Sequence, residues 1–141
     1  MIFKLTYRNP EAENIINDIG GKPFSFIEAL KIGSIGSKRM IIKNISPNLS
    51  EFSNSYSDNK YCNIEIRRNG IIIYVNISLK NYAWVITYRS LVIYKTNNFS
   101  IHANGKFITL LNNNMLRDNK KFFNLLFKLK TKCQENYIFH I

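Results

Sequence analysis

Few side chains in this sequence could carry out catalysis or bind a metal. The chain has two histidines and two cysteines, and their spacing matches neither a metal site nor a reactive thiol pair. Glu65 is the only carboxylate inside the region whose pattern predicts β-strands, so that region offers no pair of carboxylates for acid–base catalysis. We therefore expect a protein that is not an enzyme, with no catalytic residues, no metal and no cofactor.

The cysteines and the first histidine fit structural roles. Cys62 alternates in phase with Ile64 and Ile66, and Cys133 lies on the apolar face of a predicted helix, so both are expected in the core. His102 shares a strand face with Ser100 and is expected to face solvent.

Positive charge is the feature that bears most on binding. The formal net charge is +11. Residues 1–60 hold eight Lys and Arg against six Asp and Glu, whereas residues 61–141 hold twelve against three. Such a field attracts phosphates, anionic membranes and acidic proteins, although an AT-rich genome that favours Lys codons would give the same excess. The candidate contacts to an anionic ligand are Arg67, Arg68, Lys121, Lys128 and Lys132. The candidate loop contacts are Lys38, Arg39 and Lys60.

Two patterns could serve nucleic-acid or phosphate binding. Aromatic residues alternate with cations along the strand region, as in proteins that stack single-stranded bases, and the rings concerned are Tyr74, Tyr82, Trp84, Tyr88 and Tyr94. The segment 33–39 is the only Gly-rich basic loop, but it lacks the spacing of a phosphate-binding loop and precedes no helix. We interpret it as a turn.

The first third of the chain predicts two short helices. Asn9 and Pro10 form a helix start, and Gly20-Gly21 ends that helix. Ser25 and Glu28 have the spacing of a capping box, which predicts a second helix whose apolar residues include Phe26 and Leu30.

Seven strands follow between residues 40 and 110. They alternate apolar and polar residues, and Asn69-Gly70 and Asn104-Gly105 predict two hairpin turns of type I′. Lys80-Asn81 predicts a further turn, and the polar segment 46–59 predicts a long loop. A sheet of this length tends to curl or to close on itself.

The chain ends in a predicted amphipathic helix from about Asp118, which is a good helix cap, to Gln134. Its apolar stripe consists of Phe122, Leu125, Leu126, Leu129 and Cys133, widened by Phe123 and Phe127. Lysines lie on the opposite side. We expect this helix to cap one end of the sheet.

Seven antiparallel strands followed by one helix resemble the pleckstrin-homology (PH) superfold. The resemblance covers residues 39–135 and centres on the strand 82–88. The proteins that this segment resembles are bacterial PH-like domain proteins of uncharacterised role. The resemblance implies a mainly β, α+β domain: a seven-stranded PH-like barrel or roll with a capping helix at residues 39–136. Residues 1–38 would then be a helical extension, and residues 137–141 a tail.

The sequence thus predicts a non-catalytic binding or adaptor module that engages a protein partner. The alternative is peripheral binding to an anionic membrane through the basic face, and a lesser alternative is single-stranded nucleic acid. No segment has the ~20 apolar residues that cross a bilayer, and no signal peptide is evident, so we expect a cytoplasmic protein.

Overall fold

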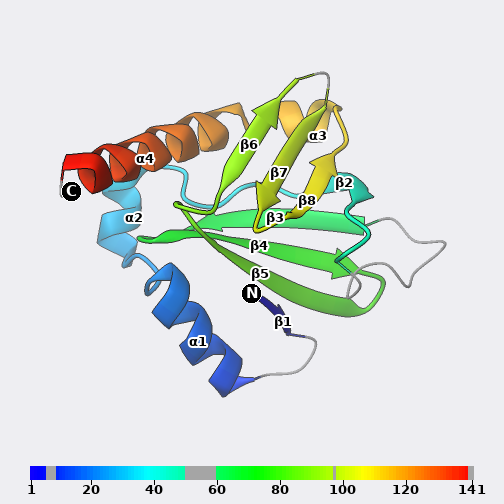
Figure 1. Ribbon diagram of the computed structural model, residues 1–141, viewed down its shortest axis with the longest axis horizontal. Helices are drawn as coiled ribbons and strands as arrows, with labels where there is room; N and C mark the ends of the chain where they lie inside the picture. Colours follow the sequence, from blue (N-terminus) through cyan, green and yellow to red (C-terminus); the bar gives the residue numbers. More distant parts are fainter. Residues whose placement is uncertain (6–8, 50–59, 97, 140–141) are drawn as a thin grey trace.

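The chain folds into one antiparallel sheet with helices packed on both of its faces. The computed structural model describes residues 1–5, 9–49, 60–96 and 98–139, with side chains up to Cys133 in the last helix. The strands are β1 (Ile2–Lys4), β2 (Met40–Ile45), β3 (Lys60–Ile66), β4 (Gly70–Ile77), β5 (Lys80–Thr87), β6 (Val92–Lys95), β7 (Phe99–Ala103) and β8 (Lys106–Leu110) (Figure 1). The helices are α1 (Pro10–Gly20), α2 (Phe26–Ile32), α3 (Asn114–Arg117) and α4 (Lys120–Phe139). The expected α+β class with a C-terminal helix is confirmed.

In the described part of the chain the sheet has eight strands. The prediction was seven, and β1 is the additional strand. The strand order is β1-β5-β4-β3-β2-β8-β7-β6. Phe3 in β1 pairs with Ala83 in β5, so the N-terminus supplies one outer strand and β6 supplies the other. The sheet is therefore open, and the expected barrel closure is not found among the described strands.

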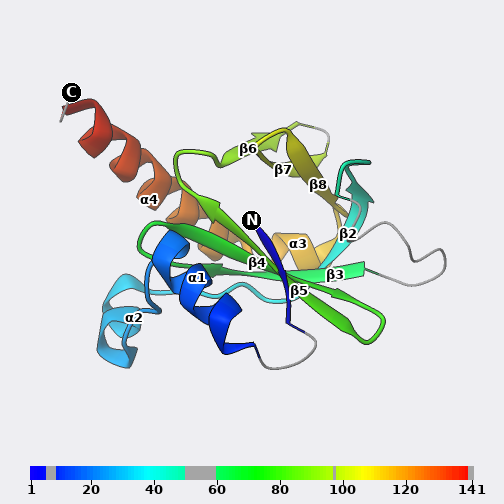
Figure 2. The same ribbon diagram turned by 60° about the horizontal axis from the view of Figure 1, so that its bottom comes forward.

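Strand β2 joins the two halves of the sheet. Met40 and Ile41 pair with β3, whereas Ile42 and the residues after it pair with β8, with a register shift between Ile42 and Asn44. Such a bulge bends a strand and increases its twist. Figure 2 accordingly shows β6, β7 and β8 set at an angle to β3, β4 and β5.

The main hydrophobic core lies between these halves and is covered by α4. Phe122, Phe123 and Leu126 are buried in it, which confirms the apolar stripe predicted for this helix. The ring of Phe123 lies 4.5 Å from that of Phe99 in β7. Burying each of these side chains stabilises the fold by roughly 1.5–3 kcal/mol, so the helix is firmly attached to the sheet.

Helix α1 covers the opposite face of the sheet. Ile16 packs there in a second cluster with Ile72, Ala83 and Val85, and Tyr74 lies against it. Strict alternation along β4 would place Tyr74 on the side away from the main core, where it would face solvent if nothing covered it. It is half-buried instead, because α1 covers this face.

The turns match the sequence prediction in one case and differ in two. Asn104 and Gly105 have φ values of 52° and 79°, which confirms the type I′ turn between β7 and β8. Neither Asn69 nor Gly70 has a positive φ, so a type I′ turn there is wrong. The β4–β5 turn lies at Ser78-Leu79, two residues earlier than predicted.

The helix caps of the first third are as predicted. Asn9 accepts a hydrogen bond from the Ala12 amide, and Ser25 and Glu28 form a complete capping box. The cap predicted at Asp118 is wrong, because the Asn113 side chain caps the short α3 and Asp118 ends it. No helix in the described part of the chain is long and apolar enough to span a bilayer.

Candidate functional site

The candidate site lies where α2 and α4 approach the β3–β4 turn. Arg68 of this turn forms an ion pair with Glu28 in α2 and lines a pocket together with residues of α4. Helix α2 buries none of its residues. Phe26, Ile27 and Leu30 are 78%, 66% and 69% exposed. Phe26 and Leu30, two of the apolar residues predicted for this helix, are thus exposed rather than packed in the core. Only Phe24, just before the helix, packs against the main core.

A small pocket lies between the segment before α2, the β3–β4 turn and α4. It has a volume of about 220 Å³. Its lining residues are Phe24, Arg67, Arg68, Tyr88, Leu129, Lys132 and Cys133. Three of the predicted anionic-ligand contacts thus meet in one pocket with an apolar wall. This combination suits a ligand that is both anionic and partly apolar.

Arg67 is buried and hydrogen-bonded within the protein, which corrects its selection as a candidate contact to an anionic ligand. It is 6% exposed and forms an ion pair with Glu65. Its Nη1 atom also donates to Asn17 Oδ1 and to the Gly21 carbonyl, both at 2.9 Å. Glu65 in turn accepts a hydrogen bond of 2.9 Å from Tyr74. Arg67 therefore anchors the end of α1 to the sheet.

Arg68 is the exposed neighbour of this anchor. Its guanidinium forms an ion pair with Glu28 in α2, and the guanidinium carbon lies 5.1 Å from the centre of the Phe24 ring. The backbone hydrogen bond from Ser25, and then Arg68, lower the pKa of the Glu28 carboxyl. Arg68 thus lies beside the exposed helix with its charge partly neutralised.

A second, wider pocket lies along α4. It has a volume of about 550 Å³ and is lined by Phe127, Lys128, Thr131 and Lys132. We call it the α4 groove. The ammonium of Lys95, at the end of β6, lies 3.8 Å from the centre of the Phe127 ring. This contact places the α4 groove beside the outer strand β6.

Lys130 links α4 to the segment after β5. Its ammonium donates to the Tyr88 carbonyl at 3.4 Å, and burial lowers its pKa. The Tyr88 hydroxyl donates to the Arg67 carbonyl at 2.7 Å, and burial raises the pKa of this phenol. These two hydrogen bonds link α4, through Tyr88, to the β3–β4 turn. Lys121, also a predicted contact, is exposed on the first turn of α4 and lines neither pocket.

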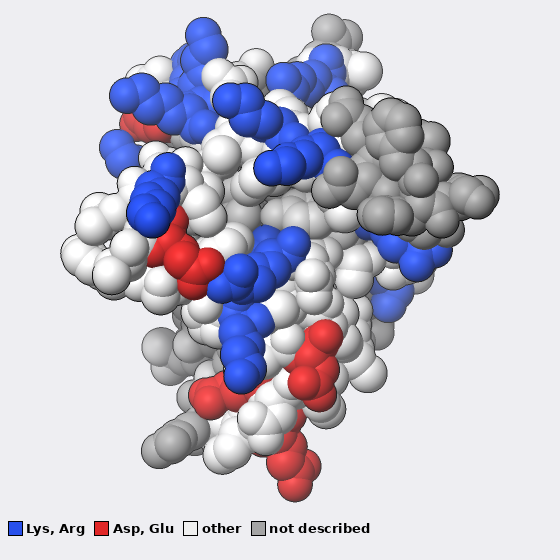
Figure 3. All heavy atoms as spheres, turned by 90° about the vertical axis from the view of Figure 1, so that its left-hand side faces the viewer, with Lys and Arg blue, Asp and Glu red and all other residues white. Residues whose placement is uncertain are grey.

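Basic residues gather over this end of the molecule. Figure 3 shows Lys and Arg side chains over much of the upper half of the face that carries α2, with some acidic side chains among them. Acidic side chains gather lower, where α1 carries the exposed residues Glu11, Glu13 and Asp18. The electrostatic field at α2 and α4 is therefore positive.

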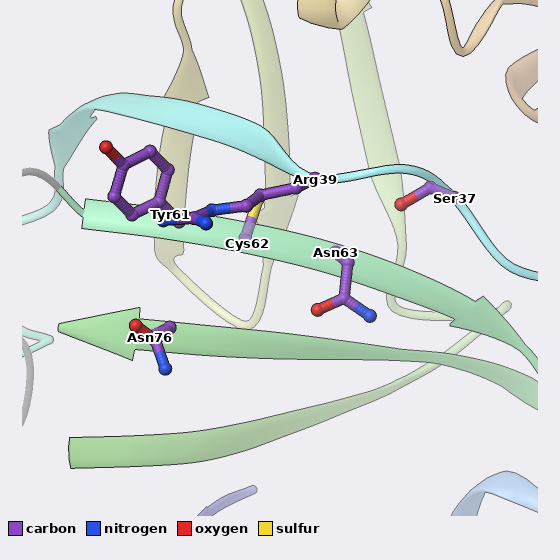
Figure 4. A pocket seen from close by; sticks show the side chains of 6 residues that line it. All are labelled: Ser37, Arg39, Tyr61, Cys62, Asn63 and Asn76. Atoms are coloured by element: carbon purple, nitrogen blue, oxygen red, sulfur yellow. The ribbon is translucent and has the colours of Figure 1, made fainter. Parts of the chain in front are cut away.

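The predicted loop contacts lie in a different place. Arg39 stacks on Tyr61, with its guanidinium carbon 3.5 Å from the ring centre. Both line a polar pocket of about 330 Å³ with Ser37, Cys62, Asn63 and Asn76 (Figure 4). Lys60 is half-buried in β3, and neither it nor Lys38 lines this pocket.

The Gly-rich loop that carries Lys38 is held in place by hydrogen bonds. Asn119 accepts from the Lys38 amide at 2.8 Å and donates to its carbonyl, while the Ser37 hydroxyl accepts from the Ile64 amide. These bonds fix the loop to β3 and to the start of α4, in keeping with its interpretation as a turn. The loop between β2 and β3 falls largely outside the described residues.

No catalytic arrangement is evident among the residues that the structure describes. Ser100 Oγ lies 2.9 Å from His102 Nε2, but no carboxylate is hydrogen-bonded to that ring in the described part of the chain. No group of three metal-ligating side chains occurs there either. Burial raises the pKa of the Cys62 thiol to about 12, so it is protonated at neutral pH.

The aromatic residues considered for base stacking are mostly unavailable. Tyr82, Trp84 and Tyr88 are buried in the main core, and Tyr74 is half-buried under α1. Tyr94 alone of the five is exposed. Four of the five rings are thus packed against other side chains of the protein and are not free to stack on bases.

Comparisons with protein-family models, with curated proteins and with solved structures found no match to this chain.

Proposed function

We propose that the chain is a non-catalytic binding module that takes up an extended, acidic segment of a partner protein along the outer edge of β6. The observation that carries this proposal is the position of β6 as the last strand of the sheet, next to the α4 groove and its lysines.

The backbone pattern of β7 and β8 indicates which groups of β6 point outward. A two-residue type I′ turn joins Ala103 to Lys106, so this pair exchanges hydrogen bonds and the odd-numbered residues of β7 bond to β8. Ile93 and Lys95 pair with two of those odd-numbered residues. Their own N–H and C=O groups therefore point away from β7, toward the space that an added strand would occupy.

The surroundings of this edge favour an acidic segment. Lys95, Lys128 and Lys132 line the approach from α4, and the Phe127 ring provides an apolar contact between them. On the other side of the strand, Val92 and Tyr94 are 43% and 50% exposed. A peptide in extended form could thus gain main-chain hydrogen bonds, one apolar pocket and charge complementarity.

The order of elements from β2 to α4 supports a PH-like domain as the scaffold. Seven strands follow in the spatial order β5-β4-β3-β2-β8-β7-β6, and the helix after them packs on the core. We propose this fold class from that order and from the sequence pattern. A fold of this kind hosts many ligands, so the binding proposal depends on the edge and the groove.

A matched pair of variants tests the edge. Peptides selected from a random library on the wild-type protein would be titrated against Lys95→Pro and Lys95→Ala. Both variants lose the charge and the contact with Phe127, but only proline also removes the outward N–H, which costs about 1–3 kcal/mol if the peptide carbonyl is left unpaired. Lys95→Pro should therefore bind about tenfold more weakly than Lys95→Ala.

Two results would count against this proposal. One is equal affinity of the selected peptides for the two variants, which would place the peptide elsewhere. The other is a selection that yields no acidic extended peptide. Amide chemical-shift changes in the wild-type protein should centre on β6 and the groove-lining part of α4.

A further inference from the structure

We infer that α2 and the cations around it form a second surface, which docks on an anionic membrane. The inference rests on the exposed side chains of α2 and is independent of the β6 edge. The helix also lies outside residues 39–135, the segment that carries the family resemblance.

The apolar part of this surface is exposed to solvent on a capped helix. A complete capping box fixes α2, although the helix has only seven residues and isolated helices of that length are marginal in water. Phe26 and Leu30 are four residues apart and Ile27 is three from Leu30, so the three side chains project from one side. Exposed apolar side chains that cluster in this way mark interaction sites.

Cations lie on and near α2, and we refer to them as its basic rim. Lys22 and Lys31 are exposed just before the helix and near its end. Arg68 contacts Glu28 on the same helix, and Lys132 lines the pocket that Arg68 and Phe24 share. Glu28 is the only acidic residue of α2, and its charge is paired. Each Lys or Arg near an anionic bilayer raises affinity about fivefold.

The size and charge of this surface favour a bilayer over a second copy of the chain. Three side chains of this exposure present roughly 400 Å², about half of the ~800 Å² that each partner of a stable dimer buries. Two copies would also bring like charges together, since each chain carries a net charge of +11. A bilayer accepts a small convex apolar surface and attracts its basic rim.

Co-sedimentation with vesicles tests this inference. The probes are vesicles of phosphatidylcholine alone and vesicles that also contain phosphatidylglycerol, at low and at physiological salt. Wild-type protein should bind the second kind only, and more weakly as salt rises. Phe26→Ser and Leu30→Ser should each weaken binding about tenfold, whereas Phe26→Trp should retain it and shift its fluorescence to shorter wavelength.

Matched controls lie at the other end of the sheet. Leu79, in the β4–β5 turn, is 90% exposed. That turn and α2 lie at opposite ends of the sheet in Figure 1. Leu79→Ser removes an equally exposed apolar side chain and should leave vesicle binding unchanged. Lys80→Glu, at the start of β5 next to this turn, should weaken binding less than Lys31→Glu, although both change the net charge by the same amount.

Four results would overturn the inference. They are no binding to anionic vesicles at low salt, equal binding to neutral vesicles, and binding that Phe26→Ser and Leu30→Ser leave unchanged. The fourth is a dimer, seen by analytical ultracentrifugation, that Phe26→Ser dissociates, since the occupant of the surface would then be a second copy. All six variants are at exposed sites and should retain the wild-type circular dichroism spectrum.

Discussion

Two adjacent arginines, each paired with a glutamate, provide a direct test of how burial sets the strength of an ion pair. The side chains of Arg67 and Glu65 are 7% and 26% exposed, and those of Arg68 and Glu28 are 51% and 38% exposed. We predict that Arg67→Ala destabilises the protein by about 3 kcal/mol. The same change at Arg68 should cost about 0–1 kcal/mol.

The larger loss of stability predicted for Arg67→Ala follows from the buried groups that this substitution leaves without a partner. Glu65 would lose its counter-charge, and Asn17 and the Gly21 carbonyl would lose a donor. Breaking a buried pair costs about 3–5 kcal/mol. We take the low end because Glu65 keeps some exposure and the hydrogen bond from Tyr74, whose pKa is raised to about 12 mainly by burial and which therefore stays protonated.

Urea denaturation followed by circular dichroism and by the fluorescence of the buried Trp84 would measure both losses. The loss for Arg67→Ala should persist at high salt, whereas any loss for Arg68→Ala should shrink. The double variant Glu65→Gln, Arg67→Met should recover part of the stability, because no unpaired charge remains. If the two single alanine variants were equally stable, the argument from burial would be refuted.

Three further predictions concern the core. Leu126→Asp, at a fully buried position of α4, should prevent folding, whereas Lys128→Glu should leave the denaturation midpoint nearly unchanged. A folded Leu126→Asp protein would mean that α4 does not cover the core. Gly70→Ala should destabilise the protein strongly, because an added Cβ would lie 2.0 Å from a carbonyl oxygen of β5. The control Gly36→Ala should be tolerated, because its Cβ would meet no atom within 4 Å. Equal urea midpoints for the two variants would contradict this prediction. In a Cys133→Ser variant, which keeps Cys62 as its only thiol, the Cys62 thiol with its pKa raised to about 12 should resist Ellman's reagent near neutral pH until denaturant is added. Rapid labelling of this variant in its native state would show that Cys62 is accessible.

Much of the local structure could be predicted because local sequence determines it. Asn9 and the Ser25–Glu28 pair cap their helices through hydrogen bonds that span three residues, and Asn104-Gly105 accepts the positive φ of its turn. The α4 stripe was likewise predictable from helical spacing. Asn69-Gly70 shows the limit of such rules. Its glycine is required by the close approach of β5 rather than by a turn with positive φ.

The candidate site could be predicted only in part. Arg68, Lys128 and Lys132 were selected by charge, and all three line pockets around α4. Arg67 was selected by the same rule, and it is buried. No local signal distinguishes two neighbouring arginines, because their burial depends on α1, which lies some fifty residues earlier in the chain.

The sequence by itself determined which segments form helices and strands, where most of them end, and that the charge is strongly positive, because these properties depend on neighbouring residues and on composition. The tertiary structure alone decided the rest. It added β1 to the sheet beside β5, covered Tyr74 with α1, and left Phe26 exposed on a helix with an intact cap. These outcomes depend on contacts between distant segments, where register and packing decide which face of each element meets water.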